Sequence, residues 1–97
     1  MKQGVVLKIL KQKSAQLTEQ FGVKSLLLLG SVARNEATTA SNVDLLVEFS
    51  RPVGYFGPFA LQDYLKSLLG CPVDLGTPDS LKPTIRERVM GEAIHIT

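Results

Sequence analysis

Apolar residues near the start of the chain recur at the spacing of an amphipathic helix. Residues three and four apart lie on the same face of an α-helix, and residues 5–21 follow this pattern up to Gly22, a residue typical of helix ends. The apolar positions are Val6, Ile9, Leu10, Leu17 and Phe21. We therefore expect a helix over residues 5–21 that packs one face against a core.

Two strands of different character are predicted next. Residues 25–29 are almost continuously apolar and end at Gly30, which is typical of a strand buried on both faces. A brief helical turn is expected from Ser31. Residues 42–49 instead alternate: positions 43, 45, 47 and 49 are apolar and share one face, whereas 42, 44, 46 and 48 share the other. This predicts a strand with one strongly apolar side.

The rest of the chain contains further helices and strands. Residues 51–58 hold two prolines and two glycines, so we expect a loop, followed by a helix over 59–69 that Gly70 closes. A short strand is predicted at 72–75, a helix at 78–90 with Asp79 or Ser80 as its N-cap, and a last strand at 92–97. In the predicted helix, Leu81, Ile85 and Val89 align on one face.

This order of elements predicts an α+β fold. We expect a single domain over residues 1–97, with a small mixed sheet of about four strands and helices packed mainly on one face. So short a chain leaves little room for a separate substrate-binding domain, and a large substrate must therefore bring much of its own recognition surface.

Composition and charge exclude several classes of function. The formal charge of +2 and the pI near 8.9 are too mild to require a nucleic acid partner. The four lysines between residues 2 and 13 are explained more simply as a solvated helix face. With a single cysteine, Cys71, and a single histidine, His95, neither an internal disulfide nor a Cys/His zinc site can form. We found no convincing signal peptide or membrane span, and expect a cytoplasmic protein.

The Gly30-Ser31 turn is a candidate phosphate site. A strand that turns at once into a helix presents free backbone N–H groups and the positive end of the helix dipole. Gly30 allows close backbone approach, and the Ser31 hydroxyl can donate another hydrogen bond. Taken alone, this dipeptide is better explained as a plain turn.

The following strand offers candidate metal ligands. Residues two apart on a strand project from the same face, about 6.6 Å apart at their Cα atoms, so Asn42 and Asp44 can converge on one ion. Asp74 is a third candidate, between Val73 and Leu75. A carboxylate in such apolar surroundings requires a partner. The alternative is structural, because strand-edge aspartates often cap turns or pair with arginine.

Taken together, these features resemble a known family. Gly-Ser at 30–31, a spacer of ten residues, a polar pair at 42 and 44, and Asp74 on a later strand are similar to the minimal nucleotidyltransferases of the DNA polymerase β-like superfamily. These proteins are the small antitoxin partners of HEPN-domain toxins. The resemblance covers nearly the whole chain and includes Ala33-Arg34, DLLVEF at 44–49, PVDL at 72–75 and EAI at 92–94.

The resemblance implies an activity and assigns site residues. It implies a Mg²⁺-dependent transfer of AMP from ATP, or another nucleoside triphosphate, to a hydroxyl of the partner toxin, in a heteromeric complex and with no membrane partner. Gly30 and Ser31 would hold the triphosphate. Two Mg²⁺ ions in an intact site would be held by positions 42, 44 and 74, and Asp74 would bind the catalytic ion or activate the hydroxyl. Arg34 would reach a phosphate or form a surface ion pair.

Asn42 departs from the family pattern, which has aspartate there. Its amide oxygen can still contact a cation, but it carries no charge and offers one ligand oxygen, so we expect a second Mg²⁺ to bind more weakly. The activity is then weakened or lost. A second hypothesis is therefore a non-catalytic antitoxin that neutralises its toxin by binding. A third, nucleic acid binding through the lysine-rich first helix with Arg86 and Arg88, lacks an aromatic stacking platform or a recognition motif.

Overall fold

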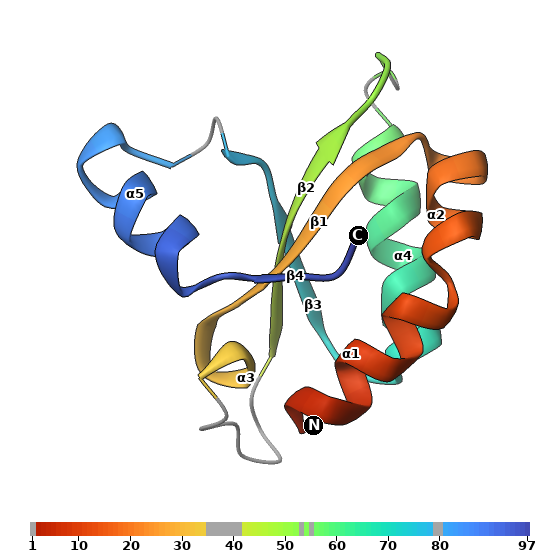
Figure 1. Cartoon of the computed structure of the whole chain (residues 1–97). Coiled ribbons are helices and arrows are strands. Elements are labelled where there is room, and N and C mark those ends of the chain that lie inside the picture. Colours follow the sequence, from red (N-terminus) through yellow and green to blue (C-terminus); the bar gives the residue numbers. More distant parts are fainter. Residues whose placement is uncertain (1, 35–41, 53, 55, 79–80) are drawn as a thin grey trace.

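A four-stranded mixed sheet organises the fold (Figure 1). The computed structural model describes residues 2–34, 42–52, 54, 56–78 and 81–97. The strands are β1 (Val23–Leu29), β2 (Val43–Phe49), β3 (Val73–Gly76) and β4 (Ile94–His95), in the order β3-β2-β1-β4. β1 is antiparallel to both β2 and β4, whereas β2 and β3 are parallel. The predicted α+β class and the mixed sheet are confirmed.

The helices lie mainly on one face of this sheet, as predicted. α1 (Gln3–Gln12), α2 (Ser14–Phe21) and α4 (Gly57–Leu69) cover that face, and α5 (Pro83–Glu92) lies on the opposite side (Figure 1). α3 (Gly30–Ala33) is a single turn that follows β1 directly. None of the helices in the described part of the chain is long and apolar enough to cross a membrane.

The core fills the space between the sheet and the helices α1, α2 and α4. Alternate residues of β2 enter it, which confirms the predicted apolar side of this strand. The buried cluster includes Val6, Leu10, Leu17, Val23, Leu26, Leu28, Val43, Leu45, Val47, Leu61, Leu65, Leu69 and Val73. Because side chains alternate along a strand, Asp44 points to the opposite face, on the side of α5.

The predicted first helix is wrong in one respect: it is broken at Lys13. The backbone of Lys13 (φ −101°, ψ 6°) leaves the helical region, so α1 and α2 are separate. The apolar period continues across the break because Leu10 and Leu17, on either side of it, are both fully buried. β1 also begins earlier than expected, at Val23, and its register with β2 shifts between Val23 and Ser25.

Two prolines mark helix starts that were placed wrongly. α4 begins at Gly57 with Pro58 in its first turn, so the predicted loop over 51–58 is too long. α5 begins at Pro83 rather than at residue 78, while Asp79 and Ser80 lie outside the described residues. Proline suits the first turn because the N–H it lacks would have no helical partner there. The last strand is shorter than the predicted 92–97, because residue 92 still belongs to α5.

Candidate functional site

Three of the predicted site residues lie together at one end of the sheet. The parallel pairing of β2 with β3 places Asp44 beside Asp74, at about the 4.8 Å spacing of neighbouring strands. Asn42 lies one residue before β2, and its side-chain nitrogen donates a hydrogen bond to the Asp74 Oδ2 atom over 3.4 Å. Two carboxylates and one amide therefore meet at a single point.

The electrostatics of this point favour a cation. Asp44 is half-buried and Asp74 is exposed. The pKa of Asp44 is raised above its usual value, first by burial, then by the negative charge of Asp74 and by a hydrogen bond between the two carboxyl groups. The positive charge of Arg34 opposes this rise in pKa. A cation bound between the aspartates would relieve the repulsion.

Gly30 is needed for the placement of Asp44. The last residue of β1, Leu29, pairs with Asp44, and Gly30 follows with φ +73°, a backbone conformation that favours glycine. A Cβ atom built on residue 30 would meet the Asp44 Oδ2 atom. The close approach that Gly30 permits is therefore, in the first place, an approach by the Asp44 carboxylate.

The remaining two predicted residues, Ser31 and Arg34, lie in α3 and directly after it. Ser31 is the second residue of α3, and its side chain lies outside what the structure describes. Arg34 follows α3, is exposed, and is close enough to Asp44 to influence its pKa. The guanidinium group is thus placed where an anionic ligand bound beside Asp44 would meet it.

Two glutamine side chains support the segments that carry the site, and the sequence analysis missed both. Gln62 of α4 donates from Nε2 to the Val73 carbonyl over 2.7 Å, directly before Asp74. Gln3 of α1 donates in the same way to the Ala33 carbonyl, also over 2.7 Å, directly before Arg34. Both bonds are partly buried. The only sequence signal was an uncharged polar residue near apolar helix positions, which is too common to be informative.

A cleft of about 270 Å³ opens beside Asp44. One wall comes from the end of β1, from α3 and from β2, and the other from α5 and the segment before it. Its lining residues are Leu29, Gly30, Arg34, Asp44, Leu81, Val89 and Glu92. The last three were not predicted as site residues. Of the three aligned apolar residues predicted for this helix, Leu81 and Val89 line the cleft, but Ile85 is 45% exposed.

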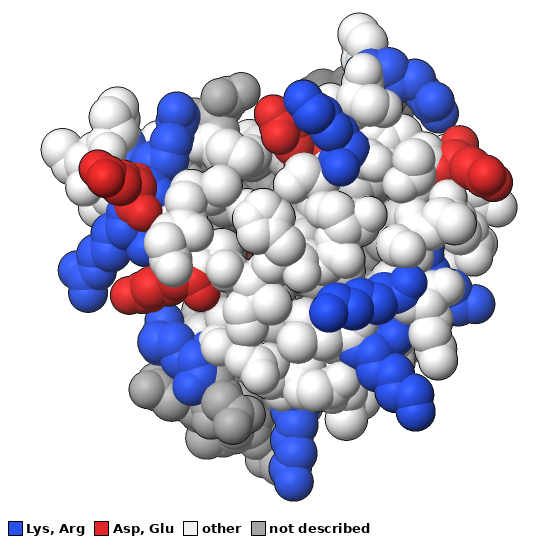
Figure 2. All heavy atoms as spheres, in the orientation of Figure 1, with Lys and Arg blue, Asp and Glu red and all other residues white. Residues whose placement is uncertain are grey.

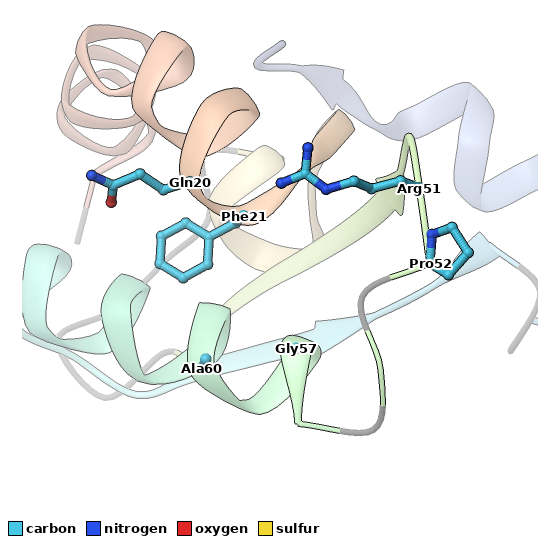
Figure 3. Close-up of a pocket in the computed structure, with 6 residues that line it drawn as sticks. All are labelled: Gln20, Phe21, Arg51, Pro52, Gly57 and Ala60. Carbon is cyan, nitrogen blue, oxygen red and sulfur yellow. The ribbon is translucent and has the colours of Figure 1, made fainter.

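A second, larger cleft lies at the other end of β2 (Figure 3). It measures about 340 Å³ and is lined by Gln20, Phe21, Arg51, Pro52, Gly57 and Ala60. Asp44 and the end of β2 at Phe49 are five residue steps apart, which is about 17 Å along the strand. Among the residues that the structure describes, no carboxylate lines this larger cleft, so the chemistry indicated by the aspartate pair belongs to the smaller one.

The ligand set suits a hard cation such as Mg²⁺. Within the described part of the chain, no group of three His, Cys, Asp or Glu side chains could hold a metal ion. Asp44, Asp74 and the amide oxygen of Asn42 offer only oxygen ligands, as Mg²⁺ prefers. Two carboxylates fit one ion well, whereas a second ion would lack the charge that an aspartate at 42 would supply.

Charged side chains do not form a basic stripe on the face shown in Figure 2. Lys and Arg side chains lie around the edge of this face, at the lower right over α1 and at the left near α5, where acidic side chains adjoin them. The centre is uncharged. A continuous basic track, such as nucleic acid binding requires, is absent from this view.

Comparison with known proteins assigns the sequence to a family. Residues 6–96 match the family described as a nucleotidyltransferase domain. A Methanocaldococcus jannaschii protein, provisionally named a protein adenylyltransferase, is 40% identical over 89 residues, which are 91% of each chain. The protein adenylyltransferase MntA of Thermococcus cleftensis is 38% identical over 88 residues, 91% of this chain and 89% of that protein.

Solved structures agree with this assignment. A structure described provisionally as a minimal nucleotidyltransferase superposes with a TM-score of 0.81 at 34% identity, over 97% of this chain and 95% of that one. A second solved structure is a complex of a tri-AMPylated Shewanella oneidensis HEPN toxin with its antitoxin. One of its chains has the same fold and superposes with a TM-score of 0.64 at 17% identity, over 94% of this chain and 71% of that one. The chain therefore belongs to the minimal nucleotidyltransferase family, among homologues that are protein adenylyltransferases.

Proposed function

We propose that this protein is an antitoxin that transfers AMP from ATP to a hydroxyl group of a partner HEPN-domain toxin. The observation that carries the proposal is the convergence of Asp44 and Asp74 beside Gly30 and Arg34. The named adenylyltransferases that match over 91% of the chain support the reaction. The complex with an AMPylated HEPN toxin supports the partner. We further propose that residues 1–97 act as one domain.

The reaction forms a bond between the acceptor oxygen and the α-phosphorus of ATP and breaks the bond from that phosphorus to the departing pyrophosphate. Mg²⁺, when bound, supplies neutralisation of the phosphate charge. Asp44 and Asp74 hold the cation, while the Gly30-Ser31 turn and Arg34 hold the triphosphate. Asp74 is the more exposed aspartate. It is therefore the better placed to accept the proton of an incoming hydroxyl group.

Asn42 sets the rate in this proposal. An aspartate at position 42 would give a second ion a third carboxylate, whereas Asn42 here donates a hydrogen bond to Asp74 instead. If its amide costs about 3 kcal/mol of transition-state stabilisation, the rate falls by roughly two orders of magnitude and a slow enzyme remains. If the second ion is lost altogether, the chain neutralises its toxin by binding alone, which is the alternative function that Asn42 favours.

The test is labelling of the purified toxin with α-³²P-ATP and Mg²⁺. We expect slow labelling by this chain, none by Asp44→Ala, and labelling faster by about 100-fold in Asn42→Asp. Equal, robust labelling by the chain and by Asn42→Asp would show that Asn42 does not limit the reaction. Inhibition of the toxin without labelling, unchanged by Asp44→Ala, would replace the enzyme with the binding antitoxin.

A further inference from the structure

We propose that the cleft between the sheet and α5 is the nucleoside site, in which Leu81 and Val89 contact the base and Glu92 accepts a hydrogen bond from a ribose hydroxyl. The inference rests on the proposed use of a nucleotide. It adds residues that the aspartate pair and the Gly-Ser turn do not include, and it assigns the base and the sugar to separate parts of the cleft.

The cleft has one wall that carries Arg34 and Asp44, to which Leu29 also contributes, and one largely apolar wall. Gly30, Arg34 and Asp44 line the side where phosphates and cation would bind, and Leu81 and Val89 line the side formed by α5 and the segment before it. A nucleotide has the same division, with charged phosphates at one end and a flat apolar ring at the other. The volume of about 270 Å³ is near the lower limit of small-molecule sites, about 300–1,000 Å³.

The helix α5 does not use its apolar side chains for the core. None of the residues of α5, Pro83–Glu92, is buried, and Ile85 is 45% exposed. Leu81 and Val89 are half-buried and face the cleft. A wall of half-buried apolar side chains that lies opposite a carboxylate is suited to a ligand that is itself apolar.

The strand register places Glu92 nearer to the phosphate end. Ile94 of β4 pairs with Leu28 of β1 in antiparallel fashion. Two residues beyond this pair, the two chain segments reach Glu92 and Gly30, and both residues line the cleft. In a nucleotide, the ribose lies between the phosphates and the base. An ionised carboxylate only accepts hydrogen bonds, and the ribose hydroxyls are donors, so Glu92 matches the sugar.

Calorimetric titration tests the base contacts without any transfer reaction. Mg-ATP and Mg-tripolyphosphate are titrated into the chain and into two variants of similar side-chain size, Val89→Thr and Leu81→Asn. We expect each variant to weaken Mg-ATP binding roughly tenfold, because a polar group then faces the base, and to leave tripolyphosphate binding unchanged. The matched control is Ile85→Thr on the exposed side of the same helix, which should alter neither titration.

The ribose contact has its own comparison. The chain should bind Mg-ATP more tightly than Mg-2′,3′-dideoxy-ATP, and Glu92→Ala should remove this preference. Arg88→Ala is the control, because Arg88 forms an exposed ion pair with Glu92 over 3.9 Å but does not line the cleft. This variant should keep the preference.

Each unfavourable outcome has a defined meaning. If Val89→Thr weakened the binding of ATP and of tripolyphosphate equally, the nucleoside site would be overturned. It would also be overturned if Val89→Thr kept its affinity for ATP but lost transfer to the toxin, and this second result would place the acceptor in the cleft. Tight, selective ATP binding without transfer to any HEPN toxin would leave the nucleoside site standing and refute the proposed function. Failure of the unaltered chain to bind either compound would refute both.

Discussion

Asp44 lies opposite Asp74 in the parallel pairing of β2 with β3, and burial together with the negative charge of Asp74 raises the pKa of Asp44. The negative charges of these two carboxylates on neighbouring strands repel each other, and the half-burial of Asp44 reduces the screening of this repulsion by water. The fold therefore holds a concentration of negative charge at one end of its sheet. Without a bound cation this arrangement opposes folding, so stability and pH should be linked at Asp44.

Removal of the Asp44 charge should stabilise the metal-free protein at neutral pH. The pKa of Asp44 is raised in the folded state. The stability that its protonated carboxyl group contributes is therefore complete below the unfolded pKa of about 3.9, and it is lost as the pH rises through the folded pKa. In EDTA at pH 7, Asp44→Asn should resist urea better than the unaltered chain, by less than about 1 kcal/mol because the group is only half-buried. The difference should vanish near pH 3. Asp63→Asn, at an exposed position of α4, is the control, and a less stable Asp44→Asn at pH 7 would contradict the linkage.

Gly30→Ala should displace the Asp44 carboxylate as well as strain the backbone. Gly30 and Gly70 have nearly the same conformation, with φ values of +73° and +69°, but a Cβ atom at 30 meets Asp44 and one at 70 meets nothing within 4 Å. Each alanine costs about 1–2 kcal/mol for the left-handed backbone. Only Gly30→Ala should also weaken Mg²⁺ binding and lower transfer. Equal losses of stability and unaltered Mg²⁺ binding in both variants would show that the contact is unimportant.

A double-mutant cycle isolates that contact. In an Asp44→Ala background, the excess destabilisation of Gly30→Ala over Gly70→Ala should disappear, because no carboxylate remains to be displaced. The free energy of unfolding from urea titrations measures the coupling. An excess that persists would have to arise from some other neighbour of residue 30.

Gln62→Ala should alter the metal requirement of the enzyme. Loss of the 2.7 Å bond to the Val73 carbonyl costs about 1 kcal/mol of stability and frees the segment that carries Asp74. We expect the Mg²⁺ concentration for half-maximal transfer to rise several-fold. Gln16→Ala is the matched control, because its 3.2 Å bond to Gln20 is exposed and far from the site in sequence. A loss of stability with an unchanged Mg²⁺ requirement would reduce Gln62 to a purely structural role.

Asn42→Asp should destabilise the protein in EDTA and stabilise it when Mg²⁺ is added. In EDTA, a third carboxylate adds repulsion and replaces the hydrogen bond that Asn42 donates to Asp74, so the variant should be less stable than the unaltered chain. Bound Mg²⁺ stabilises in proportion to the logarithm of its concentration relative to the dissociation constant. With millimolar Mg²⁺ the order of the urea midpoints should therefore invert. Parallel curves at all Mg²⁺ concentrations would mean that position 42 does not contact the ion.

The sequence predicted the strands that carry the aspartates because their local pattern agrees with their tertiary role. β2 alternates, and its apolar side faces the core while Asp44 faces away. The break at Lys13 could not be seen, because the apolar period passes through it without interruption. The start of α4 was misplaced because Pro58 was assigned to the preceding loop rather than to the first turn of the helix. The start of α5 was misplaced because the apolar spacing of Leu81 and Ile85 continues past Pro83.

The far wall of the cleft was missed for a different reason. Leu81 and Val89 were recognised as an apolar helix face, which normally implies burial against a core. That such a face lines a cleft beside Asp44 instead depends on the sheet order and on the side of the sheet to which α5 returns. Neither is a local property of the sequence. Gln3 and Gln62 were missed similarly, because their partners are backbone carbonyls 30 and 11 residues away.

The absence of buried residues from α5 has a consequence for the motions of the molecule. Local opening is least costly where few apolar contacts are broken, so the amide hydrogens of α5 should exchange with solvent long before those of β1 and β2. Asp44, on β2, would then lie on the slowest-exchanging part of the fold, and the facing wall of the cleft on one of the fastest. One side of the cleft is a fixed template and the other can adjust its distance to whatever molecule lies between them.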